Sequence, residues 1–340
     1  MATSLASQLQ AIKSVVAGAP DPIKRPQTRP SVLFAPKEAA DIDLRTILPI
    51  ALSGLEVLVD LDERFRSYKD TLFSEISLDL DREKMVPKEN EKLNGSIHSF
   101  LRLLSGHLQL PAALKTLEYL IRRYQVHVYN IDELVLCALP YHDTHAFVRI
   151  MQLMDFSDLI IFLLPLAKCC RNGKWSFLEG VKSSGAPPPR NVLVQQCIRD
   201  KGLLETLCNY ASPTKDFQHS RPVICFCTAM IVESLGAIPK LDTETVQRVL
   251  GFVFNGLNPA MKGDRDHKAG ALMVVGLLAS RATLAPKLMQ NLIFFVARLA
   301  QHDASESVDL PWLRVMIMAM ISLVQSFAAM RLLVPTFIHV

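Results

Sequence analysis

The sequence predicts an all-α fold in which short helices stack side by side into an extended array. Half of the 340 residues are hydrophobic and only 7% are aromatic, a composition that favours helix-on-helix packing over sheets. Apolar residues recur at helical spacing, and no stretch alternates with period two over a useful length. Because such short apolar helices cannot bury their faces alone, they are expected to stack on neighbours like themselves.

The first 40 residues are expected to form an N-terminal helix and a Pro-rich basic arm. Residues 5–16 predict a short amphipathic helix whose apolar face is made by Leu5, Leu9, Ile12 and Val16. Residues 18–36 contain five prolines and Gly18, a density that forbids a continuous helix and predicts an extended linker. Within this linker the motif SVLF, Ser31 to Phe34, is expected to dock as an apolar hook on the body.

Residues 41–340 are expected to form the array itself. An apolar stripe from Leu44 to Val59 predicts its first helix, which Pro49 either kinks or begins. Residues 67–90 carry many charges and predict a long connection with a short helical piece. Helical patterns follow at 91–106 and 111–125, the second with a proline at its start.

The remaining patterns continue to the end of the chain. Asn130 and Asp143 are expected to cap helices, and residues 172–190 to form a loop. The expected helices lie near 130–139, 143–154, 156–170, 191–209, 216–236, 242–256, 264–281, 284–301 and 310–334. Since two helices occupy about 40 residues, the spacing predicts a HEAT/armadillo-like α-solenoid, a right-handed superhelical array.

Charge and cysteine usage limit the function classes. The net charge of +4 is too small to predict a protein that coats nucleic acid, but the segment from Lys13 to Lys37 alone carries a charge of +4. The cysteines are odd in number and scattered, which predicts buried reduced thiols in an intracellular protein. They are Cys137, Cys169, Cys170, Cys197, Cys208, Cys225 and Cys227.

Two apolar segments are candidates for membrane-spanning helices. Residues 222–239 contain Glu233, and residues 315–330 contain Gln325 and are short for a span of roughly 20 residues. We interpret both as buried repeat helices. A membrane protein anchored by the apolar C-terminal segment remains an alternative.

No catalytic, cofactor or metal site is expected. The segment Tyr141 to His145 holds two histidines and Asp143, but zinc needs four ligands, or three and a water, and no HExxH or paired CxxC motif accompanies it. A polar helix start explains the cluster better. The chain also lacks GxSxG, dinucleotide-binding and phosphate-loop patterns, so we expect no enzyme.

Two basic clusters are candidates for RNA or partner contact. Arg122 and Arg123 stand beside tyrosines and His127, an arrangement suited to phosphate contact and base stacking, or to a solvated helix end. The second cluster lies in the linker and suits nuclear import or phosphate contact, although a solvated linker is the favoured interpretation. The candidate contact residues are Lys24, Arg25, Arg29, Arg122 and Arg123.

Three strings give the chain a specific resemblance to a known family. They are SLASQLQAI (4–12), TLFSEISLDLDR (71–82) and YLIRRYQVHVYNIDELVLCALPYHDTHAFVRIMQL (119–153), in this order. They resemble the N-terminal region of the family called U3 small nucleolar RNA-associated protein ten or HEAT repeat-containing protein one. The residues of these strings are most similar to those of a plant member. Family members are much longer, and the apolar end of this chain lacks the polar cap of a solenoid, so a fragment or shorter isoform is expected.

The resemblance implies a nucleolar scaffold of the small-subunit processome. It implies a role in pre-18S ribosomal RNA processing with U3 snoRNA, a link to ribosomal DNA transcription, and contact with other processome proteins and pre-rRNA, direct or indirect. It implies no cofactor and no membrane. The alternative is a HEAT-repeat protein-interaction adaptor outside the nucleolus.

Overall fold

The computed structural model describes residues 29–156, 173–306 and 309–333. Helices and short 3-10 segments make up its regular structure, and the β-structure of these residues is one isolated bridge between Leu241 and Ala282. The predicted all-α solenoid is therefore confirmed. The expected helices at 5–16 and 156–170 lie outside the described residues, apart from Phe156 at the edge of the second.

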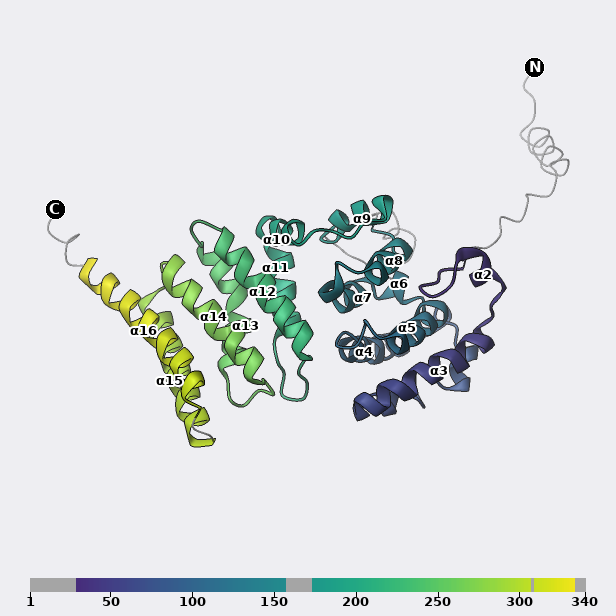
Figure 1. Cartoon of the computed structure of the whole chain (residues 1–340), viewed down its shortest axis with the longest axis horizontal. Helices are drawn as coiled ribbons and strands as arrows, with labels where there is room; N and C mark the ends of the chain where they lie inside the picture. Colours follow the sequence, from purple (N-terminus) through teal and green to yellow (C-terminus); the bar gives the residue numbers. More distant parts are fainter. Residues whose placement is uncertain (1–28, 157–172, 307–308, 334–340) are drawn as a thin grey trace, which may run out of the picture.

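The first half of the array is built around α3 and α5, which pack along each other. Its elements are α2 (Pro36–Asp41), α3 (Leu44–Leu61), η1 (Glu63–Tyr68), η2 (Glu75–Asp79), α4 (Pro87–Leu104), α5 (Pro111–Tyr124), α6 (Val126–Tyr129), α7 (Ile131–Ala138), η3 (Leu139–Tyr141) and α8 (His145–Leu153). Helix α4 packs on α7, so α4 contacts a helix that does not follow it directly in the sequence (Figure 1).

The second half stacks with a regular alternation. Its elements are η5 (Ser176–Leu178), α9 (Glu179–Ser184), α10 (Arg190–Arg199), α11 (Lys201–Ala211), α12 (Arg221–Ala237), α13 (Thr243–Leu257), α14 (Arg265–Arg281), α15 (Pro286–Glu306) and α16 (Leu310–Leu333). Helices α10, α12, α14 and α16 pack in sequence as one layer, while α11, α13 and α15 pack as the other. Each helix thus contacts mainly its neighbours, as in repeat proteins.

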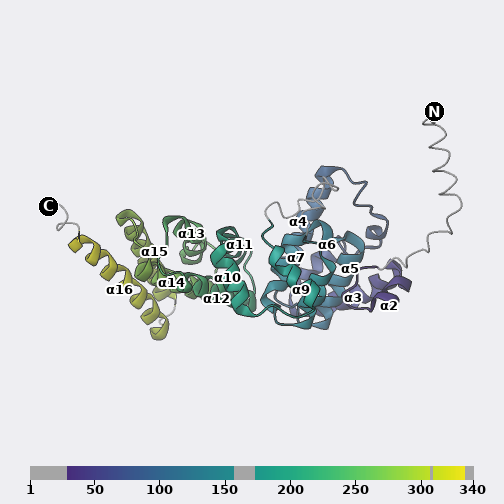
Figure 2. The same cartoon turned by 90° about the horizontal axis from the view of Figure 1, so that it is seen from above.

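The array is elongated, with α2 and α3 at one end and α16 at the other (Figures 1 and 2). A continuous row of buried side chains runs through it, from Val32 in the arm to Leu323 in α16. The solenoid therefore offers long exposed flanks instead of one enclosed centre.

Helix starts follow local sequence signals, with some differences from the predictions. Pro49 lies inside α3, whose first turn is capped by Asp43 through the amide of Thr46 (2.8 Å). The prediction that Asp143 caps α8 was wrong, because Thr144 accepts the amide of Phe147 instead. Asn130 occupies the N-cap position of α7, but its side chain makes no capping bond.

Two loop predictions also need correction. The expected helix at 191–209 is split into α10 and α11, because Asp200 accepts the amides of Gly202 and Leu203 and starts a second helix. The expected loop at 172–190 contains η5 and α9, which Trp175 anchors by donating from Nε1 to Asp132 (2.6 Å).

Cysteine burial is as expected at four described positions, while Cys225 is exposed. Helix α12 has a buried face and a solvent-facing side. Cys225 lies two residues before the buried Cys227 and therefore points to the other side of the helix. Burial raises the pKa of Cys227 to about 12, so this thiol stays protonated at neutral pH.

One described helix, over Leu310–Ala329, is long and apolar enough to cross a membrane, judged by length and composition alone. Its inner face is buried on the array through Met316 and Leu323, whereas Ile317 and Met318 face solvent. The expectation of a buried repeat helix therefore holds for one face of α16 only.

The two halves meet at a small polar junction. Arg102 on α4 donates from Nε to Nε2 of His219 (3.3 Å) and lies 4.5 Å from the centroid of the Phe217 ring. Burial, reinforced by Arg102, lowers the pKa of His219 to about 3. The neutral imidazole can then accept from the guanidinium, and the junction avoids two adjacent buried charges.

Candidate functional site

Helix α5 is the element on which the arm and the charged connection both meet. Its residues from Thr116 to Ile121 are all buried, although the segment includes Glu118. One face of α5 contacts the arm at residues 29–42, and another contacts residues 72–82. Two of the strings that carry the family resemblance, 71–82 and 119–153, therefore pack against each other here.

The arm is held by a fully buried carboxylate. Glu118 Oε2 accepts the backbone amides of Val32 (2.8 Å) and Leu33 (3.2 Å), which lie in the motif SVLF. Val32 is buried in the hydrophobic core, and Arg149 donates to the carbonyl of Phe34 (2.9 Å). The predicted apolar hook is confirmed, and its anchor is a charged side chain as much as an apolar contact.

Arg122 lies one turn after Glu118 and holds the next part of the arm. It donates from Nη1 to the carbonyl of Ala39 (2.9 Å) and from Nη2 to that of Ile42, and its side chain is almost fully buried. Arg29 also donates to the carbonyl of Ile42 (2.8 Å). Burial lowers the pKa of Arg122, and the neighbouring Glu118 carboxylate opposes that effect. This interior ion pair fixes the path of the chain into α3.

The opposite side of α5 fixes the charged connection. Tyr119 shares a hydrogen bond with Ser77 Oγ (2.6 Å), Tyr124 donates to the carbonyl of Leu72 (2.6 Å), and Arg123 donates to the carbonyl of Ser77. These bonds satisfy backbone groups of a segment with little regular structure of its own. They hold η2 beside α3.

Arg82 closes the same segment from inside the molecule. Its guanidinium donates to the carbonyl of Tyr124 (2.7 Å) and to Oδ1 of Asn90 (2.9 Å) and Asn130 (3.0 Å), and it lies 4.4 Å from the centroid of the Tyr129 ring. Burial lowers the pKa of Arg82 to about 10. Asn130 is thus used as an acceptor for Arg82, which explains why it does not cap α7.

A hollow of about 440 Å³ lies where the arm enters α3. It is lined by residues of the arm, α3 and the end of α5, among them Arg29, Asp43, Arg122 and His127. Nδ1 of His127 is buried and has no hydrogen-bond partner, and burial lowers the pKa of this histidine to about 4. The lining of the hollow is mixed, because Leu44 and Ile121 contribute apolar surface beside the polar side chains, and Arg29 lies at its exposed side.

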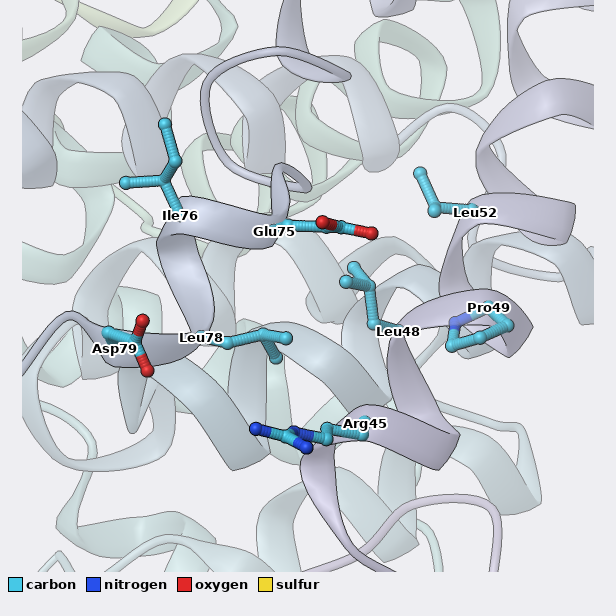
Figure 3. Close-up of a pocket in the computed structure, with 8 residues that line it drawn as sticks. All are labelled: Arg45, Leu48, Pro49, Leu52, Glu75, Ile76, Leu78 and Asp79. Atoms are coloured by element: carbon cyan, nitrogen blue, oxygen red, sulfur yellow. The ribbon is translucent and has the colours of Figure 1, made fainter.

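An apolar groove lies on the other side of α3, between its first turns and η2. Its volume is about 590 Å³, and it is lined by Arg45, Leu48, Pro49 and Leu52 of α3 and by Glu75, Ile76, Leu78 and Asp79 of η2. Figure 3 shows Glu75 and Leu78 extending from η2 toward Leu48, with Arg45 beside Leu78. We call this feature the α3–η2 groove.

The predicted contact residues fall into three groups. Lys24 and Arg25 lie outside the described residues. Arg29 is exposed at the mouth of the hollow where the arm enters α3, whereas the guanidinium groups of Arg122 and Arg123 donate to backbone carbonyls inside the protein. The structure thus brings Arg29 and Arg122 together on the carbonyl of Ile42 and turns Arg123 toward η2.

The histidine cluster does not converge on one point. His142 is buried, with Nδ1 3.2 Å from the carbonyl of Pro188 and its ring against Phe226, whereas His145 is exposed at the start of α8. No three His, Cys, Asp or Glu side chains come together as a metal site among the described residues. His142 instead helps to join the two halves of the array.

Sequence reasoning missed Glu118 and the α3–η2 groove. A glutamate within the apolar pattern of residues 111–125 was the signal for Glu118, since a charge there requires buried partners. The groove gave no local signal, because its two walls are about 25 residues apart in the chain and meet only through α5.

No family model matches the chain. The chain is 53% identical over 325 residues to an Arabidopsis thaliana protein described as uncharacterized; the match covers 96% of this chain and 14% of that protein. It is 33% identical to HEAT repeat-containing protein 1 of Danio rerio, over 79% of this chain and 12% of the relative. It is 32% identical to U3 small nucleolar RNA-associated protein 10 of Pyricularia oryzae, over 85% and 16% respectively. The chain thus spans less than a fifth of the length of these relatives.

Proposed function

We propose that this chain, which belongs to the family of HEAT repeat-containing protein 1 and U3 small nucleolar RNA-associated protein 10, acts as a non-catalytic scaffold in ribosome biogenesis. The observation that carries the proposal is sequence similarity along most of the chain to relatives whose name places them with U3 snoRNA. The similarity to an Arabidopsis thaliana protein agrees with the resemblance of the three strings to the sequence of a plant family member.

A more detailed proposal concerns where in the cell the protein acts and in which step of ribosome biogenesis. We propose that the protein acts in the nucleolar small-subunit processome, with U3 snoRNA and pre-rRNA, in pre-18S rRNA processing, and that it is linked to ribosomal DNA transcription. An elongated helical array with long flanks suits this work, because a solenoid presents many contact positions along one surface. The architecture favours holding partners over chemistry.

Direct RNA contact, where it occurs, is assigned to the basic arm. Lys24, Arg25 and the exposed Arg29 are the proposed contacts, because phosphate recognition needs accessible cations. Arg122 and Arg123 are proposed to support partner contact indirectly, by holding the arm and η2 in place. Few RNA crosslinks are expected within residues 40–340.

The experiment is affinity purification of the tagged protein from nuclei, followed by measurement of co-purified U3 snoRNA and by imaging. Nucleolar signal with enrichment of U3 snoRNA over an unrelated nuclear RNA supports the scaffold proposal. A cytoplasmic, RNA-free complex contradicts it and favours the adaptor outside the nucleolus.

Ultraviolet crosslinking with sequencing tests the assignment to the arm. Lys24→Ala with Arg25→Ala is expected to lower crosslinking several-fold. The matched control is Lys287→Ala with Lys240→Ala, which removes two cations elsewhere in the array. Dense crosslinks within residues 40–340, unchanged by the arm variant, would overturn the assignment.

A further inference from the structure

The α3–η2 groove exposes apolar surface that the described fold leaves uncovered. Ile76 is 85% exposed, the largest value among the large exposed hydrophobic side chains of the described residues. It lines the outer edge of the groove on η2, and its side chain points away from Leu48 and Leu52 of α3 (Figure 3). The hydrogen bonds of Arg123 and Tyr119 to Ser77 hold η2 in this position, so the groove has a fixed wall.

Charged side chains flank the apolar surface of the groove. Glu75 and Asp79 lie on the η2 side and Arg45 on the α3 side, so its charged side chains sum to −1. An occupant suited to it has an apolar stripe and a cation beside that stripe. A short amphipathic helix with few charges has these properties.

Residues 5–16 of this chain carry that pattern. On a helix, Leu5, Leu9, Ile12 and Val16 fall within an arc of about 60°. Lys13 is the one charged side chain of residues 1–16 and flanks this stripe, while Ser7 and Ser14 lie on the opposite face. The segment therefore complements the groove in both apolar surface and charge.

The tether is long enough for the segment to reach. Arg29 donates to the carbonyl of Ile42, only three residues before Arg45 at the groove. Residues 17–28 can span up to about 40 Å when extended, whereas the groove residues from Arg45 to Leu52 cover about 10 Å of α3. The linker can place the segment in the groove of its own chain.

We propose that residues 5–16 dock as an amphipathic helix in the α3–η2 groove of the same chain, with Lys13 facing Glu75 and Asp79. The arm would then be fixed at two places, by Glu118 at Val32 and by the groove beyond the linker. Its basic segment, residues 24–29, would be displayed as a closed loop beside α3.

The test places a photoreactive benzoyl-phenylalanine at position 76 of the full-length chain. Crosslinks are mapped in a mixture of isotopically light and heavy protein, so that contacts within one chain and between chains are distinguished. The expected result is crosslinking within one chain to residues 4–16. The control probe replaces Val57, which is exposed on α3 away from the groove and should not capture this segment.

Paired variants separate docking from nonspecific collapse. Leu9→Glu with Ile12→Glu should lower the crosslink yield by about tenfold, because two apolar anchors are lost. Ser7→Glu with Ser14→Glu adds the same charge to the opposite face and should lower it far less. Neither variant alters the described body, so a folding defect does not confuse the result.

Three results would overturn the proposal: crosslinks that join light and heavy chains, crosslinks that map outside residues 4–16, and equal loss in both variants. Crosslinks between chains would indicate that the groove binds a second copy. None of these outcomes depends on the nucleolar role, so failure here leaves the proposed function untouched.

Discussion

Glu118 shows how one buried charge organises the N-terminal part of this protein. Its carboxylate is fully buried, accepts two amides of the arm, and lies 3.8 Å from the guanidinium of Arg122. A buried carboxylate is tolerated only when it is paired and hydrogen-bonded. Since both hydrogen bonds of this carboxylate come from amides of the arm, arm and helix stabilise each other.

Replacing Glu118 with Ala is expected to lower the free energy of unfolding by about 3 kcal/mol, because two amides lose their acceptor and the Arg122 guanidinium loses its ion-pair partner. Chemical denaturation measures the loss, and hydrogen exchange of Val32 and Leu33 should accelerate. Glu56→Ala, on the exposed side of α3, is the control and should change stability little. Unchanged exchange at Val32 would contradict the assigned role.

His127 predicts a dependence of stability on pH. Burial lowers its pKa from 6.5 to about 4, so below pH 6.5 the unfolded chain binds a proton that the folded protein does not. Stability is therefore expected to fall as the pH drops from about 6.5 toward 4, by up to about 1.4 kcal/mol per pH unit from this group.

Denaturation midpoints between pH 7 and pH 5 provide the measurement. His127→Asn should reduce this slope and leave the part that His219 contributes, because the pKa of His219 is also lowered, to about 3. Val128→Ala, a neighbouring change without a titrating group, should keep the full slope. An identical slope in His127→Asn and the unaltered chain would show that another group is responsible.

At the scale of elements, the contact between α3 and α5 decides how η2 and the arm are placed. Gly54 allows this contact, because a Cβ there would lie 2.5 Å from the carbonyl oxygen of Ala112 on α5. The close approach brings Glu118 and Arg122 under the arm. The glycine is therefore required by packing and not by backbone conformation.

Gly54→Ala is expected to lower stability by about 2 kcal/mol, because the helices must move apart. Gly95→Ala is the matched control: its site in α4 is exposed and open, and the change should raise stability by about 0.5–1 kcal/mol. Thermal unfolding of both variants checks the opposite signs. A rise in stability of equal size in both variants would indicate helix propensity alone and would contradict the role of Gly54 in the α3–α5 contact.

At the scale of the molecule, the array buries its core between neighbouring layers and leaves the outer face of α16 uncovered. Five of its apolar side chains from Val315 to Val324 are 42–62% exposed. Exposed apolar patches of this kind promote association. The same face accounts for the membrane-like composition of this helix.

Ile317→Lys with Ile321→Lys is expected to reduce self-association in sedimentation velocity while the helical content is retained, because both side chains face solvent. Met316→Lys is the contrasting variant: its side chain is fully buried, and a charge there should cost about 3 kcal/mol or more. Carbonate extraction should release the unaltered chain from membranes. Retention in the membrane fraction would favour the anchored alternative.

Local chemistry alone was enough to predict most of the helices. The apolar spacing of residues 44–59 and the proline at position 111 describe α3 and α5 to within a few residues, because helical period and start signals are properties of neighbouring residues. Cap choice was less reliable. Thr144 caps α8 in place of the expected Asp143, and Asp200 caps α11 and so divides one expected helix into two. Both cap positions depend on the residue at which the preceding turn closes.

The sequence on its own determined that this chain is a stack of helices with an apolar hook in its arm, because periodicity and proline placement act over a few residues. Only the tertiary structure decided that Arg122 faces inward, that Glu118 holds the arm, and that α3 and η2 enclose a groove. Each of those features joins segments tens of residues apart, and their relative position is fixed by packing on α5. That packing depends on the whole array.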